Sequence, residues 1–202
     1  MIDGYPLLWW SLKAFHDENP STELIVVLPE TFTDYWKELF SGLPVNKQYP
    51  HKITTGGKSR TESVKNGLLL IEEPESLVAI HDGARPLVSI NLIKRGWEAA
   101  SSSGAAVPAV DVIDSLRKVT SEGNEFVDRS LYVAVQTPQV FKTRVIKEAY
   151  DKFPEEVFSD DATAVEKNGG EIILFPGDQN NRKVTHQGDI EMTELLIRKL
   201  NG

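Results

Sequence analysis

The chain contains no cysteine, which excludes disulfide bonds and thiolate metal sites and agrees with a reducing, cytoplasmic location. It has no apolar run of the roughly 18 residues that a membrane helix needs, and no leader of the secretory type. Positive charge is scarce, because 22 Lys and Arg stand against 30 Asp and Glu, for a formal net charge of −8. The composition therefore argues against nucleic-acid binding, which needs a basic face, but is compatible with a phosphorylated substrate bound by locally gathered cations.

Several catalytic signatures are also missing. The four histidines show no metal-ligand spacing, and no Gly-x-Ser-x-Gly sequence presents a serine nucleophile. The glycine turn at residues 56–57 is not a Walker P-loop, because Lys52 stands five positions before Gly57, where that motif needs a glycine. No Gly-x-Gly-x-x-Gly follows a strand pattern, so a dinucleotide-binding oxidoreductase fits the fold class but lacks its motif.

What the chain does contain is the pattern of one α/β domain. Its 202 residues, 40% of them hydrophobic, suit a single core. Aliphatic runs alternate with helical apolar faces, which predicts a doubly wound, mainly parallel sheet with right-handed crossovers. Strands are expected at 24–28, 52–55, 77–81, 105–110 and 171–175. Helices are expected from Pro6 to Phe15, from Thr31 or Thr33 to Phe40, from Ser59 or Thr61 to Leu69, and at 90–102, 142–153, 160–167 and 189–200.

The alternation breaks at residues 111–135. This stretch has no helical periodicity, and its apolar residues flank the polar turn Ser121-Glu122-Gly123-Asn124. That pattern is typical of a β-hairpin and predicts an arm that projects from the sheet. A two-stranded arm is marginal alone and needs something to pack against, often a second subunit.

The stretch Val78 to Val88 is the most informative one. A buried strand ends on Asp82, Gly83 allows a turn or a close ligand, and Pro86 fixes the backbone next to Arg85. A carboxylate and a guanidinium at the carboxyl end of a strand lie where open α/β sheets bind ligands. The simpler explanation is a surface ion pair at a strand end.

Other short motifs are each open to a purely structural explanation. Gly56-Gly57-Lys58-Ser59-Arg60 leads into a helix, where free N–H groups and two cations suit a phosphate, or it is a capped turn. Arg129 and Lys183 can be solvated, and Thr137 can be a turn hydroxyl. Helix capping explains Ser159, Asp160 and Asp161.

In their order and spacing these motifs resemble one family, the 2-C-methyl-D-erythritol 4-phosphate cytidylyltransferases of the non-mevalonate isoprenoid pathway. The resemblance covers essentially the whole chain, and the Ala-Arg-Pro form at residues 84–86 favours this group over the related ribitol-phosphate enzymes. The motifs are Gly56-Gly57-x-x-Arg60-x-x-Ser63-Val64, His81-Asp82-Gly83-Ala84-Arg85-Pro86, Asp114-Ser115, Asp128-Arg129, Gln136-Thr137-Pro138-Gln139-x-Phe141 and Lys183-Val184-Thr185.

The resemblance implies a Rossmann-like nucleotidyltransferase fold and attack by methylerythritol phosphate on the α-phosphorus of CTP. The products are 4-diphosphocytidyl-2-C-methyl-D-erythritol and pyrophosphate, and Mg²⁺ holds the triphosphate, with Asp82 as the candidate ligand. It also implies a homodimer formed through the 111–135 arm, which carries its arginine into the partner's site. The protein is expected to work without nucleic acid or membrane.

The same resemblance assigns roles to individual residues. The nucleotide is contacted by Gly57, Lys58, Ser63, Asp82 and Gly83. The second substrate is contacted by Asp82, Arg85, Ser115, Thr137 and Ser159. Arg129 and Lys183 hold its phosphate for attack and are the catalytic candidates.

The chain departs from the family pattern at its start. The family opens with a strand and a glycine-rich loop that wraps the triphosphate, whereas residues 1–6 here align just after that loop. The single domain 1–202 is thus expected to be incomplete at its N-terminus, through truncation, and to catalyse poorly as it stands. The alternatives are a cytidylyltransferase for another polyol phosphate, such as ribitol 5-phosphate, and a catalytically silent dimeric binding protein.

Overall fold

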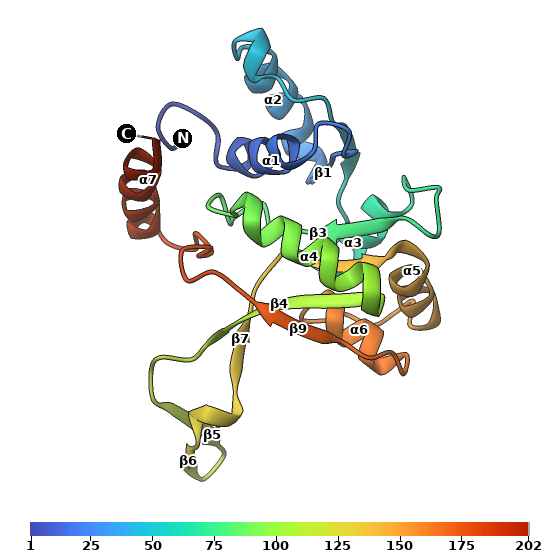
Figure 1. Cartoon of the computed structure of the whole chain (residues 1–202), viewed down its shortest axis with the longest axis vertical. Coiled ribbons are helices and arrows are strands. Elements are labelled where there is room, and N and C mark those ends of the chain that lie inside the picture. Colours follow the sequence, from blue (N-terminus) through green and yellow to red (C-terminus); the bar gives the residue numbers. More distant parts are fainter. Residues whose placement is uncertain (202) are drawn as a thin grey trace.

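The computed structural model describes residues 1–201, with side chains up to Lys199, as a mixed α/β molecule (Figure 1). The helices are α1 (Leu7–Glu18), α2 (Glu30–Ser41), α3 (Arg60–Leu68), α4 (Ile90–Ser103), α5 (Thr143–Lys152), α6 (Asp161–Lys167) and α7 (Gln187–Asn201). The strands are β1 (Ile25–Leu28), β2 (Lys52–Thr55), β3 (Leu77–Ile80), β4 (Ala105–Asp111), β5 (Leu116–Thr120), β6 (Gly123–Val127), β7 (Val133–Val135), β8 (Gln139–Lys142) and β9 (Ile173–Pro176). None of these helices is long and apolar enough to span a bilayer.

The strands form three separate sheets. β1 pairs in parallel with β2, and β5 pairs with β6 in the hairpin. The largest sheet has the order β3-β8-β4-β7, with β9 parallel to β4. The predicted α/β class is confirmed, but of the pairings in the largest sheet only β4–β9 is parallel. β7 pairs antiparallel with β4, and β8 lies antiparallel between β3 and β4, in a stretch where the sequence pattern indicated a loop running into a helix.

Helices cover both faces of this largest sheet. One hydrophobic cluster gathers residues of α1 and α4, and the other gathers residues of α5 and α6. Because side chains alternate along a strand, the neighbours Val140 and Phe141 of β8 lie in opposite clusters, and neither is exposed to solvent. β8 is therefore a central strand that joins the two halves of the core.

Local signals account for several helix ends. Ser59 and Ser89 accept N–H bonds from Glu62 and Leu92 and so cap α3 and α4, and Ser59 is one of the two predicted starts of α3. Gly104 ends α4 with a φ of 88°, which favours glycine. The predicted caps of α2, Thr31 and Thr33, are wrong. The residue before that helix is Pro29, which fixes φ and makes no side-chain cap bond.

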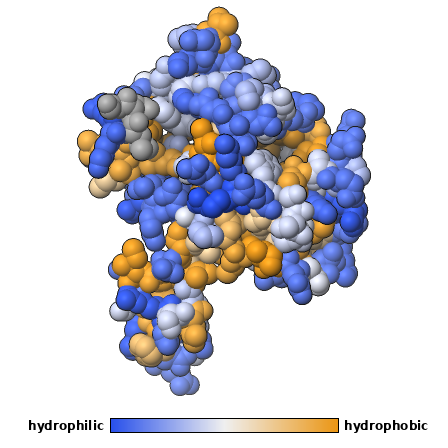
Figure 2. Space-filling view, viewed as in Figure 1, coloured by the Kyte–Doolittle hydropathy of each residue, from blue (hydrophilic) through white to orange (hydrophobic). Residues whose placement is uncertain are grey.

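The predicted arm is present. β5 and β6 form a hairpin that projects from one end of the body in Figure 1. Apolar residues lie on it and on the adjoining part of the body in Figure 2. Four apolar side chains of this region, Ile113, Val119, Phe126 and Leu131, are 68 to 82% exposed. A surface of this kind on a thin arm is typical of a contact with another chain.

Candidate functional site

The candidate site lies at the carboxyl end of β3, where Asp82 follows the strand. Its backbone N–H donates to the hydroxyl of Thr137, 3.0 Å away. The residues of 81–85 are only partly exposed. The loop after β9 reaches the same place, because Val184 N–H donates to the Ala84 carbonyl over 2.8 Å. The structure thus brings together segments 81–85, 136–139 and 177–185, as the sequence motifs predict.

Three cations surround the Asp82 carboxylate. Lys183 Nζ lies 3.2 Å and Arg85 Nε 3.4 Å from Oδ2, and Arg60 Nε lies 3.7 Å from Oδ1. Burial by itself would raise the pKa of this carboxyl, but Lys183, Arg60 and Arg85 hold the pKa below its ordinary value. Asp82 is therefore a fixed anion that gathers positive charge within an acidic protein.

The neighbouring His81 is held in a single tautomer. Its Nε2 lies 3.1 Å from the Arg85 carbonyl, which can only accept, so Nε2 carries the proton. Nδ1 then accepts from the hydroxyl of Thr137, 3.0 Å away. Burial lowers the pKa of His81 to about 4. A neutral imidazole therefore orients Thr137 and the turn that carries Asp82.

Arg60 connects this cluster to a buried acid. Its guanidinium donates to both oxygens of Asp161 over 3.0 and 2.6 Å, and Tyr150 donates its hydroxyl to the same carboxylate over 2.6 Å. The Asp161 side chain has 0% exposure. Burial would lower the pKa of Arg60, but Asp161 and Asp82 raise it, while burial and Asp161 together raise the pKa of the Tyr150 hydroxyl. This network fixes the start of α3 against the start of α6.

The glycine turn before α3 is tightly folded. Gly57 N–H donates to the Ser63 hydroxyl over 3.1 Å, and Ser63 donates to the Ser59 carbonyl over 2.9 Å. A Cβ on Gly57 would lie 2.2 Å from the Cβ of Glu62, so no other residue fits without movement. The Lys58 side chain is exposed, while its N–H donates to the Glu62 carboxylate over 2.7 Å.

The motif 136–139 connects three loops. Gln136 exchanges hydrogen bonds with the backbone of Asp178 over 2.9 and 3.1 Å. Gln139 donates to Asp160 over 2.9 Å and accepts from the N–H groups of Asp161 and Ala162. Its carboxamide therefore supports the first turn of α6.

The loop 177–185 packs against the motif 136–139. Asn181 is fully buried, donates to the Thr137 carbonyl over 2.7 Å, and accepts from Arg85 through its own carbonyl over 2.9 Å. This packing fixes the position from which Lys183 reaches Asp82.

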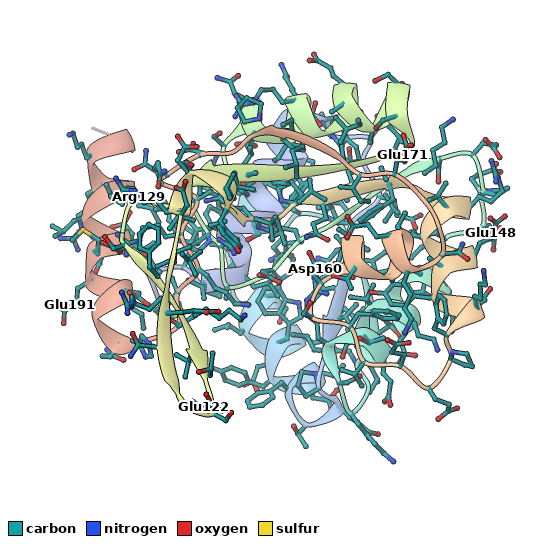
Figure 3. All side chains as sticks on the ribbon, turned by 90° about the horizontal axis from the view of Figure 1, so that it is seen from below. Glu122, Arg129, Glu148, Asp160, Glu171 and Glu191 are labelled. Carbon is teal, nitrogen blue, oxygen red and sulfur yellow. The ribbon has the colours of Figure 1, made fainter. Side chains whose placement is uncertain are left out.

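Two groups of predicted residues lie elsewhere. Ser159 is exposed just before α6 and is not its cap; the cap is Asp160, which accepts from Thr163. Ser115 and Arg129 are exposed on the arm, and Arg129 donates to the Ile113 carbonyl. Within residues 1–199 neither arm residue has a hydrogen bond or ion pair to the Asp82 cluster. Figure 3 shows Arg129 to one side and Asp160 near the middle of the molecule.

A cavity of about 1260 Å³ opens beside the cluster. One end is lined by Asp82, Gly83, Arg60, Ser63 and Lys183, and most of the rest of its wall is aliphatic. The cluster therefore faces open space in which a ligand of nucleotide size can lie.

Sequence reasoning missed several contributors to this site. The sequence pattern indicates that Asp161 caps or begins a helix, and nothing in it indicates the inward position that its contacts with Arg60 and Tyr150 reveal. The pattern likewise gives Gln139 no role beyond its place in a motif. One signal was available: Arg60 in the glycine motif is a cation, and residues 159–161 contain one acid more than a helix cap needs. The charges alone do not show that these two residues pair with each other.

Comparisons with known proteins agree on one family. The family model described as 2-C-methyl-D-erythritol 4-phosphate cytidylyltransferase matches residues 1–199. The chain is 40% identical to the protein of that name from Phocaeicola vulgatus over 196 residues, which cover 97% of this chain and 88% of the relative. It is also 40% identical to the one from Caldanaerobacter subterraneus over 204 residues, covering 98% and 88%.

Solved structures give the same result. The crystal structure of 2-C-methyl-D-erythritol 4-phosphate cytidylyltransferase from Thermus thermophilus matches with a TM-score of 0.81 and 36% identity, over 98% of this chain and 91% of that one. The structure of 4-diphosphocytidyl-2C-methyl-D-erythritol synthase from Anaerococcus prevotii matches with a TM-score of 0.85 over 98% and 88%, at 24% identity, which shows the shared fold.

Proposed function

This chain belongs to the family of the 2-C-methyl-D-erythritol 4-phosphate cytidylyltransferases, and we propose that its Asp82 cluster positions the two substrates. The reaction of the family moves a cytidylyl group from CTP to 2-C-methyl-D-erythritol 4-phosphate in the non-mevalonate isoprenoid pathway. A phosphate oxygen of the acceptor forms a bond to the α-phosphorus. The bond from that phosphorus to the bridging oxygen of pyrophosphate breaks, and pyrophosphate leaves with the electron pair. The protein contributes position and positive charge rather than a covalent intermediate.

The observation that supports this assignment best is the gathering of Lys183, Arg85 and Arg60 around Asp82 at the end of the cavity. Lys183 has the most exposed side chain of the three, at 46% against 32% for Arg60 and 14% for Arg85, and it lies on the loop 177–185. We expect Lys183 to move from Asp82 to the acceptor phosphate. Asp82 then has free oxygens that can accept hydroxyl groups of the ribose or the polyol.

The glycine turn suits the other end of CTP. Gly57 tolerates no side chain, because a Cβ there would overlap Glu62, and Ser63 and Lys58 lie on the same turn. In the proposed complex, Ser63 exchanges its bond from Gly57 N–H for a bond to cytidine. Thr137 and Ser159 lie toward the polyol, with Thr137 oriented by His81.

A homodimer would complete the site. Ser115 and Arg129 lie on an arm that projects from its own body and carries exposed apolar side chains. We propose that two arms pack on one another or on the partner's body, and that Arg129 then reaches the partner's acceptor phosphate. Burying Phe126 and Val119, which are 75 and 82% exposed, would stabilise such a contact by roughly 1.5–3 kcal/mol for each side chain.

A divalent cation, Mg²⁺, is proposed to accompany the triphosphate. Within residues 1–199 no group of three or more His, Cys, Asp or Glu is arranged to hold a metal. Mg²⁺ is commonly held by one or two carboxylates together with substrate phosphates, and Asp82 can supply that carboxylate once the phosphates draw its cations away. When bound, the ion would neutralise charge on the phosphates.

A cytoplasmic location, consistent with the absence of cysteine, belongs to the same proposal.

The polypeptide 1–202 by itself is proposed to bind CTP weakly. The cations nearest the cavity are already paired, since Asp82 and Asp161 face Arg60, Arg85 and Lys183. That leaves little net positive charge for a triphosphate.

A substrate panel with matched variants tests the assignment. Calorimetry measures binding of CTP, 2-C-methyl-D-erythritol 4-phosphate and ribitol 5-phosphate, and pyrophosphate release measures turnover. Lys183→Ala should weaken binding of the methylerythritol phosphate by about ten- to a hundred-fold, the range expected for one charge-assisted hydrogen bond. Lys94→Ala, at an exposed lysine of α4, is the control and should change nothing. A preference for ribitol 5-phosphate, or equal losses in both variants, would overturn the proposal.

A further inference from the structure

The hydroxyl of Thr137 makes two hydrogen bonds within the protein. Its Oγ1 accepts the backbone N–H of Asp82 over 3.0 Å and lies 3.0 Å from Nδ1 of His81. A hydroxyl has one proton and two lone pairs, so the direction of the bond to His81 decides what is left for a ligand. That direction depends on which nitrogen of the His81 ring carries the proton.

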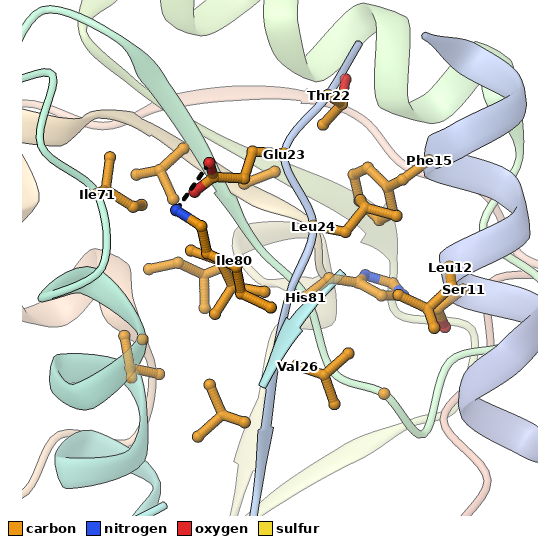
Figure 4. A pocket seen from close by; sticks show the side chains of 18 of the residues that line it. Ser11, Leu12, Phe15, Thr22, Glu23, Leu24, Val26, Ile71, Ile80 and His81 are labelled. Carbon is orange, nitrogen blue, oxygen red and sulfur yellow. Dashed lines mark ion pairs between the residues drawn. The ribbon is translucent and has the colours of Figure 1, made fainter. Parts of the chain in front are cut away.

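The surroundings of the His81 ring place its proton on Nε2. This nitrogen lies 3.1 Å from the Arg85 carbonyl, which has no proton to give. Phe15 packs against the ring edge to face, with centroids 5.5 Å apart, and Figure 4 shows the ring directed toward α1 beside Phe15. Burial disfavours a charged ring, and among the described residues no carboxylate is hydrogen-bonded to it. The ring is therefore neutral, and Nδ1 is an acceptor.

Thr137 consequently donates its only proton to His81. One lone pair of Oγ1 takes the N–H of Asp82, and one lone pair remains. Thr137 is only 5% exposed, and its carbonyl accepts from the Asn181 side chain over 2.7 Å, so the residue is held in place. Toward a bound molecule, its hydroxyl is thus an acceptor and not a donor.

The Asp82 carboxylate has the same polarity. Its cations keep it ionised, and an ionised carboxylate only accepts hydrogen bonds. Oδ1 is paired with Arg60, whose Nε is 3.7 Å away, which is longer than a hydrogen bond. The donors Lys183 and Arg85 contact the other oxygen, Oδ2. Oδ1 and the Thr137 hydroxyl therefore suit a ligand group that donates, such as an alcohol, whereas the oxygens of an ionised phosphate only accept.

We propose that His81 is a positioning residue that sets the specificity of this part of the site. By taking the proton of Thr137, it makes Thr137 select a hydroxyl group of the polyol over a phosphate oxygen. The second substrate is thereby bound in one orientation, with a hydroxyl at Thr137 and its phosphate at the cations. This inference rests on the proposed function for the identity of the ligand, while the polarity of Thr137 follows from hydrogen bonds within the protein.

Nuclear magnetic resonance on the full 202-residue chain tests this polarity without a ligand. In protein labelled with nitrogen-15 in its histidine rings, His81 should show a protonated Nε2 and an unprotonated Nδ1. Thr137→Val removes the donor to Nδ1 and should shift the Nδ1 resonance, while Nε2 changes little. Thr137→Ser keeps the hydroxyl and should leave both resonances near their positions in the parent chain.

Two substitutions of His81 separate its two hydrogen bonds. His81→Asn places an amide oxygen near the position of Nδ1, so it keeps an acceptor for the Thr137 proton. His81→Gln places an amide nitrogen near the position of Nε2, so it keeps the donor to the Arg85 carbonyl and releases the Thr137 proton. The two variants lose comparable packing, and only the second is expected to change the polarity of Thr137.

Calorimetry with these variants compares 2-C-methyl-D-erythritol 4-phosphate with analogues in which fluorine, which never donates, replaces one hydroxyl at a time. The parent chain and His81→Asn should bind one of these analogues about ten-fold more weakly than the polyol phosphate, as expected for one lost hydrogen bond. In His81→Gln the freed proton can turn to the fluorine, and the ratio should fall to about three-fold or less. Thr137→Val offers neither donor nor acceptor and should not distinguish the compounds.

Three outcomes would overturn the proposal. The first is a protonated Nδ1 in the parent chain, and the second is equal binding of the polyol phosphate and every fluorinated analogue. The third is a ratio in His81→Gln that equals the ratio in the parent chain. If the parent chain binds none of these compounds while Nε2 is protonated and Thr137→Val shifts Nδ1, the proposed function fails and the polarity of Thr137 stands.

Discussion

Asp161→Asn perturbs the most deeply buried charge next to the site. Asp161 has no exposed side-chain surface and takes three hydrogen bonds from Arg60 and Tyr150, the shortest of them 2.6 Å. The amide keeps the shape but removes the charge and turns one acceptor into a donor. Arg60 is then left with Asp82, 3.7 Å from its Nε, as its nearest acid.

The size of the effect follows from burial. Removing one partner of a buried ion pair costs about 3–5 kcal/mol, and we expect the lower end because the Arg60 side chain is 32% exposed and water can reach it. For a domain of this size about 3 kcal/mol corresponds to a drop of about 6–12 °C in melting temperature. Urea unfolding followed by circular dichroism measures the free energy directly.

Matched variants separate charge loss from other effects. Asp151→Asn, at an exposed acid of α5, should stay within about 0.5 kcal/mol of the parent. Tyr150→Phe removes one donor and keeps the ion pair, so it should cost about 1 kcal/mol. If Asp161→Asn costs no more than Asp151→Asn, the reasoning that this network fixes α3 against α6 is refuted.

Three further outcomes are expected. Because the pKa of His81 in the fold is about 4, the unfolded chain takes up the proton first as pH falls. Stability should therefore be complete above pH 6.5 and decline toward pH 4, by at most about 3 kcal/mol; urea titrations of His81→Gln should lack this decline. Gly57→Ala should destabilise by about 1–3 kcal/mol in the same assay, because its Cβ would overlap Glu62, whereas Gly188→Ala, with open space around it, should not. Phe126→Glu on the arm should shift sedimentation toward a monomer, and Phe32→Glu on α2, 56% exposed, should not; a dimer that survives the first would remove the arm from the interface.

Local chemistry made much of the fold predictable. Ser59, Ser89 and Gly104 mark helix ends through bonds and backbone angles that involve only near neighbours. The hairpin was equally predictable, because apolar residues flank a polar turn that contains Gly123. The boundaries of these elements agree with the sequence pattern within a few residues.

β8 was missed for a physical reason. Its four residues start with a polar glutamine next to a proline, and a run of this length has no reliable periodicity of its own. It becomes a strand because β3 and β4 pair with it from both sides. Only long-range pairing decides its place.

The sequence by itself determined the family, the α/β class, the arm and the identity of the residues at the end of β3, because these follow from motifs and from periodicity along the chain. Only the tertiary structure decided that three cations share Asp82, that Asp161 faces inward to Arg60, and that β1 and β3 line one cavity. The reason is that electrostatic contacts and cavities depend on distances between segments far apart in sequence, which no local pattern encodes.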